Sequence, residues 1–534
     1  MSTDLKYIPD AEQLTTEEHS EKDIYSIEGR NNNKDNIRYN DLPWYKVSHL
    51  RHLNFCILVI SLSSTTLGYD SSMLNGLQSL AYWRDYMGNP TGTTLGALTN
   101  GTIFGLILAN PLAPYIADKY GRRVAIISGQ IIVIIGSVLQ GASTNYAFFL
   151  VSRIIAGVGS ILSMVSSPAL ISEISYPTHR HVTTTFFNTN YYVGAAIAAW
   201  VTFGTSSLSN HYAWRIPSYL QGSIALIQLS LFWMVPESPR YYISKGKIEK
   251  AEEVLIKHHI GNSQDPGYIG LIKFEVEEIQ AALEMEKISA SISYLDFFKT
   301  SANRKRLFIC FFIAVLMQLS GNGLVSFYLS KVLNSIGITD EKEQLKINGS
   351  LMIYNWVTAV SVSFVVNRFR RRTLFMTSTI LMLITYVIWT VLSAINEQRN
   401  FEQASLGKGV LAMIFFYYLG YNMGANGLPY LYLTEILPYN QRTKGINIML
   451  ILFNIILIYN GFVNPVAMDA ISWRYYIVYC CVILIEVVVV YFFLPETSGY
   501  TLEEVCQVFG DTPEMITTVN GSQSKTSVTH IESV

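Results

Sequence analysis

Long apolar stretches alternate with short polar loops along most of the chain. A helix that crosses a bilayer needs about 20 mostly apolar residues, and twelve stretches approach or exceed that length. They lie at 53–74, 94–117, 124–142, 147–172, 182–203, 215–235, 306–331, 347–366, 373–394, 409–434, 446–467 and 473–494. The pattern predicts an all-α membrane protein with twelve transmembrane helices.

The segments between and beyond these stretches are polar. Residues 237–305 carry many charges with apolar residues at helical spacing, which predicts a soluble helical linker. Both ends of the chain are too polar to form a packed core. The predicted organisation is a disordered tail at 1–45, a six-helix bundle at 46–236, the linker at 237–305, a second six-helix bundle at 306–496 and a tail at 497–534.

The second half of the chain repeats landmarks of the first in the same order, about 250 residues later. Such a repeat indicates two copies of one structural unit. The paired landmarks are ADKYGRR (117–123) with NRFRRR (367–372), EISYPTHR (173–180) with EILPYNQR (435–442), Trp214-Arg215 with Trp473-Arg474, and Pro236-Glu237 with Pro495-Glu496.

Composition and charge narrow the class of protein. Half of the residues are hydrophobic and only 14% are charged, whereas a soluble protein carries about a quarter charged residues. The net charge of −1 gives no reason to expect a nucleic-acid partner. The five cysteines show no paired spacing, so neither a disulfide framework nor a metal site is expected. No nucleophile and base pair or nucleotide loop is present either, so we expect no enzyme activity and no cofactor.

The distribution of Lys and Arg predicts the orientation. Ten of them lie in the short loops at 118–123, 173–180, 367–372 and 435–444, and the linker adds more. Because cytoplasmic loops are enriched in Lys and Arg, we expect these loops, the linker and both termini on the cytoplasmic side.

Several motifs resemble the sugar porter branch of the major facilitator superfamily over residues 45–510. They are DKYGRR (118–123), RIIAGVG (153–159), PESPR (236–240) and LPETSG (494–499), with GYDSSMLNG (68–76) and QLSGNGLVSFYL (318–329) most similar to fungal permeases for lactose, cellobiose and related sugars. The resemblance implies the major facilitator fold, two six-helix bundles with a cytoplasmic helical linker, which transports sugar by alternating access.

Charged residues recur at the cytoplasmic helix ends of both halves. Charge-assisted pairs that form only when the inner gate is shut would favour the outward-open state; alternatively, the charges only anchor helix ends. The second copy has Asn367 in place of the acid and Arg370 in place of the glycine, which predicts a weaker latch there. The candidate gate residues are Asp118, Arg122, Arg123, Glu173, Arg180 and Glu237 in the first half, and Arg368, Arg371, Arg372, Glu435, Arg442 and Glu496 in the second.

Three ionisable residues lie far from the ends of the predicted spans: Asp70, Arg153 and Glu486. Charge inside a bilayer is expensive and is usually functional. Asp70 and Arg153 are expected at similar depth, and the resemblance to proton-coupled sugar symporters implicates them in proton coupling. The alternative is a permanent structural ion pair. The sequence offers no partner for Glu486 and no role for it.

Amide side chains gather in the spans of the second half. Amides both donate and accept hydrogen bonds, as sugar hydroxyls require, and aromatic rings cover the apolar side of a sugar. The candidate sugar-binding residues are Asn188, Gln318, Asn322, Asn355, Asn422, Asn426, Tyr430 and Asn454. The resemblance places Gln318, Asn355, Asn422 and Tyr430 where sugar porters contact substrate. The alternative for each Asn is a hydrogen bond between helices.

Two residues of the chain bear on which sugar it binds. Met317 and Gly323 stand where many hexose porters carry amides, which favours a larger or differently held sugar. We therefore expect a monomeric transporter of the plasma membrane that moves a mono- or disaccharide, with lactose-like or cellobiose-like sugars favoured, together with protons. An uncoupled facilitator and a sugar-sensing receptor that does not transport remain the alternatives.

Overall fold

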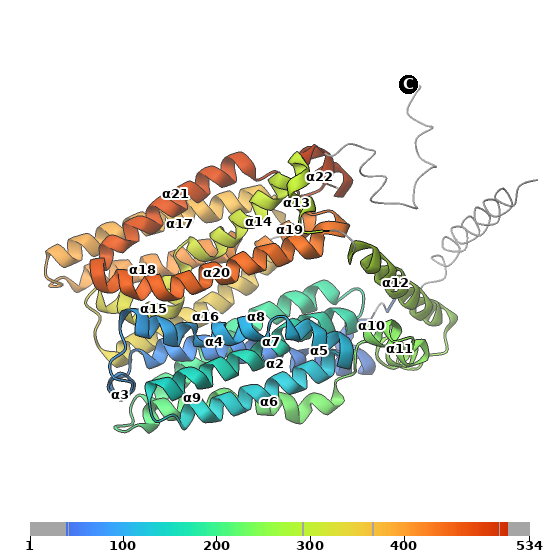
Figure 1. Cartoon of the computed structure of the whole chain (residues 1–534), viewed down its shortest axis with the longest axis horizontal. Coiled ribbons are helices and arrows are strands. Elements are labelled where there is room, and N and C mark those ends of the chain that lie inside the picture. Colours follow the sequence, from blue (N-terminus) through green and yellow to red (C-terminus); the bar gives the residue numbers. More distant parts are fainter. Residues whose placement is uncertain (1–38, 41, 291–292, 366–367, 501, 511–534) are drawn as a thin grey trace, which may run out of the picture. The chain divides into compact units, whose positions relative to one another are not determined.

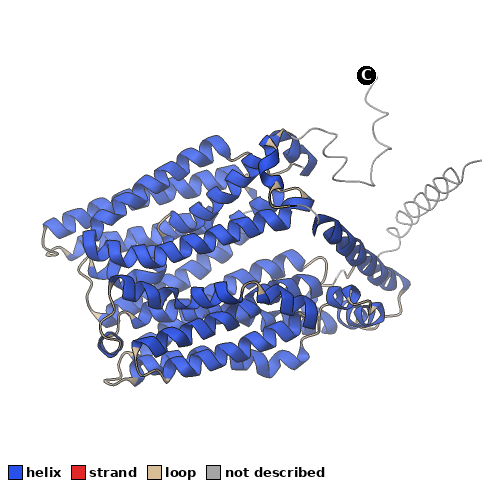
Figure 2. Ribbon diagram, in the orientation of Figure 1, coloured by secondary structure: helices blue, strands red, loops and turns tan. Residues whose placement is uncertain are grey.

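The computed structural model describes residues 39–40, 42–290, 293–365, 368–500 and 502–510 of the 534-residue chain. Every regular element in these residues is a helix (Figure 2). The chain divides into two compact units, one drawn from Met1–Phe55 and Glu237–Glu284, the other from Cys56–Pro236 and Met285–Val534.

The larger unit holds the long apolar helices. Its first half begins within α2 (Ser48–Leu77) and continues with α3 (Ala81–Tyr86), α4 (Gly92–Ala109), α5 (Leu112–Tyr120), α6 (Arg122–Gly141), α7 (Tyr146–Ile174), α8 (Arg180–Thr205), α9 (Tyr212–Leu231) and η2 (Phe232–Met234). The second predicted span is divided between α4 and α5 at Pro111, which cannot donate a backbone hydrogen bond. Figure 1 shows α4, α6, α7 and α9 running side by side.

The second half of this unit repeats the arrangement. It contains α13 (Asp296–Lys299), α14 (Ser301–Leu319), α15 (Asn322–Asn334), α16 (Glu341–Val365), α17 (Arg371–Gln398), α18 (Ala404–Tyr421), η5 (Asn422–Asn426), α19 (Leu428–Ile436), α20 (Tyr439–Ile471), η6 (Ser472–Arg474), α21 (Tyr475–Phe493) and α22 (Leu502–Phe509). In the contacts that join the halves, α8 packs against α16 and α4 packs against α20.

Two of the predicted spans are interrupted in the second half. Span seven is divided into α14 and α15 at Gly321, whose φ of 95° suits a residue without a Cβ atom. Span ten is divided into α18 and α19 by the π-helical turn η5, beside Gly427 and Pro429. Such breaks are tolerated in membrane helices where neighbouring side chains satisfy the freed backbone groups.

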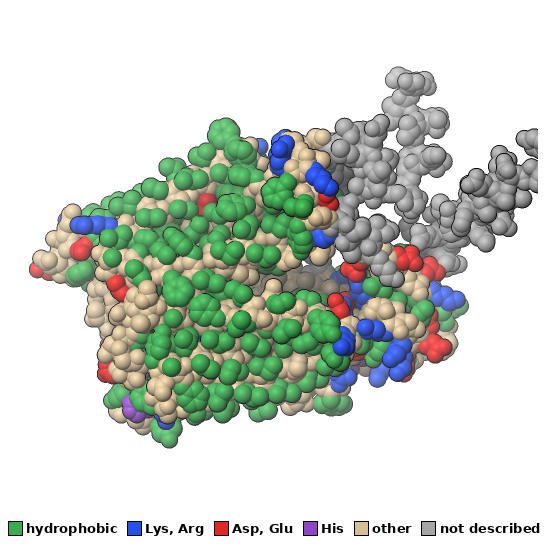
Figure 3. All heavy atoms as spheres, in the orientation of Figure 1, with side chains coloured by type: hydrophobic (Ala, Val, Ile, Leu, Met, Phe, Trp, Pro, Cys, Tyr) green, Lys and Arg blue, Asp and Glu red, His purple; other side chains and the backbone are tan. Residues whose placement is uncertain are grey.

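Seven helical segments of the described chain have the length and hydropathy of membrane spans, and one of them, Gln441–Phe493, contains two predicted spans. Apolar side chains cover most of the long helices on the face shown in Figure 3, whereas charged side chains gather near the helix ends. Small residues let neighbouring helices approach closely. A Cβ atom on Gly105 of α4 would lie 2.0 Å from the carbonyl oxygen of Ile154 on α7, a contact that any larger residue would break.

The smaller unit combines the start of α2 with part of the predicted linker. It contains α10 (Pro239–Ser244), α11 (Ile248–Leu255), the π-helical turn η3 (Ile256–Ile260) and most of α12 (Pro266–Ala290). Its apolar core includes Ile243, Leu255 and Ile272. The rings of His52 on α2 and His258 on η3 stack with centroids 5.5 Å apart, so the base of α2 packs on these short helices.

Candidate functional site

A buried ion pair joins α2 to α7. The side chains of Asp70 and Arg153 are 2% and 3% exposed, and the two guanidinium nitrogens donate to the two carboxylate oxygens over 3.1 and 3.2 Å. Thr102 of α4 and Gln221 of α9 also donate to Asp70, over 2.8 and 3.1 Å. Arg153 in turn donates from Nε to the carbonyl oxygen of Leu98, 2.9 Å away. The carboxylate thus accepts from four donors on three helices, an arrangement that suits its ionised form.

A cluster of amides and hydroxyls lies where α8, α16 and η5 meet, with Asn422 at its centre. Asn422 donates to the oxygens of Asn355 and Thr358 over 3.1 and 3.0 Å. Its own oxygen accepts from Tyr192 over 3.2 Å and from Asn426 over 2.9 Å. The Tyr192 hydroxyl also accepts from Asn426, 3.1 Å away. Tyr192 belongs to the first half and the others to the second, so the cluster links the two bundles.

A second group of polar side chains surrounds the break in span seven. Asn322 donates to the carbonyl oxygen of Met317 over 3.2 Å and to the hydroxyl of Tyr421. Ser326 and Tyr418 share a hydrogen bond of 2.8 Å. Because Tyr418, Tyr421 and Asn422 end the same helix, this group continues into the Asn422 cluster.

Two polar atoms in these groups are buried without a hydrogen-bond partner in the part of the chain that the structure describes. They are the Oε1 atom of Gln318, an acceptor, and the Nδ2 atom of Asn355, a donor. Buried polar atoms are nearly always paired, and each exception calls for an explanation. Ligand groups that both donate and accept hydrogen bonds suit such atoms.

Three other candidates are not brought into these groups by a described hydrogen bond. Asn454 donates to the carbonyl oxygen of Leu450 on its own helix, 2.8 Å away. Asn188 is exposed on α8, and Tyr430 is 38% exposed on α19.

Sequence reasoning missed several members of the site. Tyr192 and Tyr421 were passed over because aromatic residues in spans are usually apolar filling, although Tyr192 follows Asn188 by four positions and so shares its helix face. Thr102 and Gln221 were missed because neutral polar residues give no signal of a charged partner.

Candidate gate residues of the first half meet at the end of the bundle. Arg122 pairs with Glu173 over 3.2 Å and with Asp118 over 3.0 Å. Arg123 donates to the carbonyl oxygen of Trp233, 3.4 Å away. Arg180 is half-buried at the start of α8, and Glu237 belongs to the smaller unit, where its carboxylate accepts from the amide of Ser238.

The second half builds a matching group. Arg371 pairs with Glu435 over 3.1 Å, and Glu435 also accepts from the Thr497 hydroxyl. Glu496 accepts from the backbone amides of Arg371 and Arg372 over 2.9 and 3.1 Å, at the N-terminus of α17. Arg372 donates to the Tyr491 carbonyl oxygen, Arg368 is exposed and Arg442 is half-buried. The substituted Asn367 lies outside the described residues.

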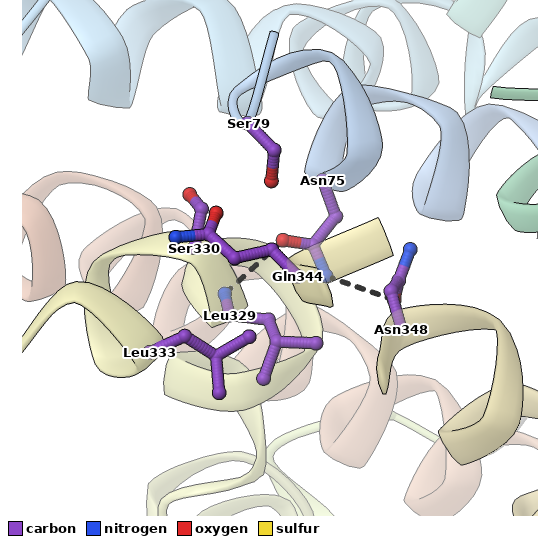
Figure 4. A pocket seen from close by; sticks show the side chains of 7 residues that line it. All are labelled: Asn75, Ser79, Leu329, Ser330, Leu333, Gln344 and Asn348. Atoms are coloured by element: carbon purple, nitrogen blue, oxygen red, sulfur yellow. Dashed lines mark hydrogen bonds between the residues drawn. The ribbon is translucent and has the colours of Figure 1, made fainter. Parts of the chain in front are cut away.

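Hydrogen bonds join the two halves at the opposite end of the bundles (Figure 4). Asn75 of α2 accepts from the amide of Leu329 over 3.1 Å and donates to Asn348 over 3.4 Å. Gln78 donates to the carbonyl oxygen of Phe327, 2.8 Å away. Asp469 accepts from the amide of Gly92 over 3.0 Å and pairs with Lys331. This end, which the charge pattern predicts to be the outer one, is bridged.

Comparisons with known proteins match this architecture. The family model described as sugar (and other) transporter matches residues 56–509. The low-affinity glucose transporter HXT4 of Saccharomyces cerevisiae (strain JAY291) is 27% identical over 489 residues, covering 89% of this chain and 84% of the relative. The MFS-type transporter criB of Aspergillus cristatus is 28% identical over 461 residues, covering 85% of this chain and 93% of the relative.

Solved structures share the fold. The inward-open xylose transporter XylE from E. coli superposes with a TM-score of 0.70 at 21% identity, covering 85% of this chain and 99% of XylE. A second XylE structure, described as the proton:xylose symporter bound to 6-bromo-6-deoxy-D-glucose, gives a TM-score of 0.68 at 22% identity. It covers 86% of this chain and 100% of XylE. The predicted all-helical major facilitator fold is therefore confirmed, and the chain belongs to the sugar transporter family of the major facilitator superfamily.

Proposed function

We propose that this protein is a proton-coupled symporter for a mono- or disaccharide, with lactose-like or cellobiose-like sugars favoured. The observation that carries the sugar assignment is the unpaired buried acceptor of Gln318 and donor of Asn355 within a group of amides and tyrosines. Sugar hydroxyls donate and accept at once, so they can satisfy both atoms without bringing charge into the membrane.

The rest of the group supports the same ligand class. Asn322, Asn422 and Asn426 provide further amides, and Tyr192, Tyr418 and Tyr421 provide rings and hydroxyls, as sugar sites require. Curated relatives are named as glucose and hexose transporters. Asn460 packs tightly beside Gly323, where a Cβ atom would lie 3.3 Å from its nitrogen. The preference for a sugar larger than a hexose therefore rests on the sequence, which has Met317 and Gly323 where many hexose porters carry amides.

The proton would be carried by Asp70. In this conformation its carboxylate accepts four hydrogen bonds, two of them from Arg153. A movement that withdraws Arg153 would leave the carboxylate buried without its counter-charge, and an unpaired buried carboxylate takes up a proton. Transport by rocking of the two bundles, with both termini in the cytoplasm, would then expose Asp70 to one side of the membrane at a time.

A specific observation also favours a second function, an uncoupled sugar facilitator. All three partners of Asp70 are in place, which is equally expected of a permanent structural ion pair that never titrates. In that case the site would bind and release sugar without a proton.

Uptake of labelled lactose, cellobiose, glucose and xylose in a transport-deficient yeast tests these functions. The proposal expects uphill accumulation that a protonophore abolishes, and Asp70→Asn should lose accumulation while it keeps sugar counterflow. Asp70→Glu, which retains the carboxyl, serves as the matched control. Accumulation by Asp70→Asn with unchanged pH dependence would exclude coupling through Asp70, and saturable binding without exchange would identify a receptor.

A further inference from the structure

A second buried carboxyl lies in the other bundle. Glu486 is 1% exposed in the middle of α21, within the last predicted span. Its Oε2 atom lies 2.9 Å from the hydroxyl oxygen of Ser320, and its Oε1 atom is buried without a partner in the described chain. Neither the ion pair at Asp70 nor the predicted gates use this residue.

The hydrogen bonds around Ser320 favour a protonated Glu486. The Ser320 hydroxyl oxygen lies 2.5 Å from the carbonyl oxygen of Leu316 and 2.9 Å from the carboxyl of Glu486, close enough to donate to either. A hydroxyl has one hydrogen, so beside an ionised carboxylate one of the two contacts lacks a hydrogen. A protonated Glu486 supplies the second hydrogen, because it can donate to Ser320 while Ser320 donates to Leu316.

The surroundings of Glu486 agree with a neutral acid. Among the described residues, Tyr417 of α18 lies near Glu486, Tyr386 of α17 packs against Tyr417, and Tyr479 of α21 packs against Tyr386. These hydroxyls donate elsewhere, to Ser320, Gly321 and Asn464. Among the described residues no lysine, arginine or histidine pairs with Glu486. An ionised Glu486 would therefore be a buried charge with Ser320 as its one described donor and no counter-charge, which is far costlier than a neutral carboxyl.

Ser320 belongs to the break that shapes the sugar site. It precedes Gly321 and lies between Gln318 and Asn322 in the chain. Side chains hold the carbonyl groups freed by this break: Asn460 donates to Gln318 over 2.5 Å, Tyr417 to Ser320 over 3.0 Å and Tyr386 to Gly321 over 3.2 Å. The bond from Glu486 fixes the remaining polar atom of Ser320. A change at Glu486 would therefore act on Ser320, which stands between Gln318 and Asn322 in the chain.

We propose that Glu486 is a second proton-binding site, and that its proton holds the break in span seven in the conformation that binds sugar. Glu486 is a positioning residue, since it acts on the sugar through Ser320. Deprotonation would admit water or displace Ser320, and Gln318 and Asn322 would move with it. The proposal rests on the sugar transport proposed above, but not on coupling through Asp70.

The test is sugar counterflow as a function of pH in proteoliposomes, measured in an Asp70→Asn background so that Asp70 does not contribute. With Glu486 intact, the apparent KM should rise at alkaline pH, by about tenfold for each pH unit once the carboxyl titrates. Glu486→Gln, which mimics the neutral acid, should keep its low-pH KM across the whole range. Glu402→Gln, an exposed glutamate between α17 and α18, is the matched control and should behave like the parent.

An alkaline rise in KM that persists unchanged in Glu486→Gln would overturn the proposal. A measurement on the unsubstituted residue covers the case in which that variant does not fold. The infrared spectrum of the parent at neutral pH should contain a protonated carboxyl band that shifts in Ser320→Ala, and its absence would refute the proposal. Failure of the parent to exchange any sugar would instead contradict the proposed function, and the infrared band alone would then decide the state of Glu486.

Discussion

At the scale of single residues, Gln318 and Asn355 differ from the other candidate sugar-binding amides because each keeps one buried polar atom without a described partner. A sugar that pairs with such an atom gains a full hydrogen bond, and nothing in the protein has to be released. The amide of Asn454 is already used by its own helix. Among the candidates that the resemblance favours, Gln318 and Asn355 thus keep polar atoms available for a ligand.

We expect Asn355→Ala and Gln318→Ala each to raise the KM for sugar by about tenfold, which corresponds to the loss of one hydrogen bond of about 1.4 kcal/mol. The measurement is initial uptake over a range of sugar concentrations at equal surface expression. Asn190→Ala is the matched control, because the one described hydrogen bond of this amide is to Phe186 on its own helix. If Asn355→Ala kept the wild-type KM, its amide would serve helix packing alone.

The residue scale also shows what the sequence could not reveal. The pairing of two buried charges was predictable, because an isolated charge in a span needs a partner. The other two donors to Asp70, Thr102 and Gln221, and the link through Tyr192 were not predictable. A neutral polar side chain can hydrogen-bond to many different partners. Which partner it has depends on the packing of α4, α8 and α9, which the sequence does not show.

At the scale of elements, an arginine–glutamate pair lies at the charged helix ends of each half, Arg122 with Glu173 and Arg371 with Glu435. The loss of an acid in the second copy predicted a weaker latch. In the structure, however, Glu496 accepts from two backbone amides at the start of α17 while Glu435 holds Arg371. A helix N-terminus is a favourable place for a carboxylate, so we expect this contact to strengthen the second latch.

We expect Arg122→Ala and Arg371→Ala to reduce the transport rate to a similar extent, because their side chains are 14% and 10% exposed and each pairs with one half-buried glutamate. The measurement is uptake at equal surface expression, with the exposed Arg368→Ala as control. A severe loss of transport in Arg122→Ala, together with normal transport in Arg371→Ala, would instead support the prediction that the second latch is weaker.

The opposite end of the molecule depends on a kink that has no glycine or proline. Tyr328 within α15 has φ −135° and ψ 32°, which interrupts the helical hydrogen bonds. Asn75 and Gln78 of α2 bind the backbone on either side of it, at Leu329 and Phe327. The breaks at Gly321 and near Pro429 can be expected from local sequence, but this kink is stabilised by side chains of the other half, so local sequence does not reveal it.

We expect Asn75→Ala to open the predicted outer end. The amide of Leu329 would be left unpaired in the closed state at a cost of about 1–3 kcal/mol, which shifts the equilibrium about fivefold or more. The measurement is labelling of a cysteine placed at Ser79, which lines the pocket beside Asn75 (Figure 4), by a membrane-impermeant thiol reagent, with the native cysteines replaced. Asn89→Ala, an exposed site, is the control. Equal labelling of both variants would show that Asn75 does not hold the predicted outer end closed.

At the scale of the whole molecule, the duplicated pattern of apolar stretches predicted the helices well because bilayer thickness sets the length of each span. All twelve predicted spans correspond to helices, two of them divided where glycine stands and one at Pro111. The pattern did not predict that the first turns of α2 and the linker helices form a unit of their own. That association depends on histidines whose partners lie about 200 residues away in the chain.

This smaller unit should respond to pH. Burial, and then the positive charge of His52, Lys257, His259 and His49, lower the pKa of His258 from 6.5 to about 4. The nearby acid, Glu275, is bound to His259 at 2.8 Å. Because a released His258 binds a proton more readily than the packed one, packing of the linker helices on α2 is strongest above pH 6.5 and weakens as the pH falls toward 4.

We expect the packing equilibrium to be about tenfold weaker at about pH 5.5 than at neutral pH. Hydrogen exchange of residues 248–260, corrected for the intrinsic effect of pH, measures it. His258→Phe keeps an aromatic ring against His52 but cannot take up a proton, so it should remove most of the acid response. His211→Phe, outside this unit, is the matched control and should retain the response. An undiminished acid response in His258→Phe would assign the effect to the other histidines of the contact.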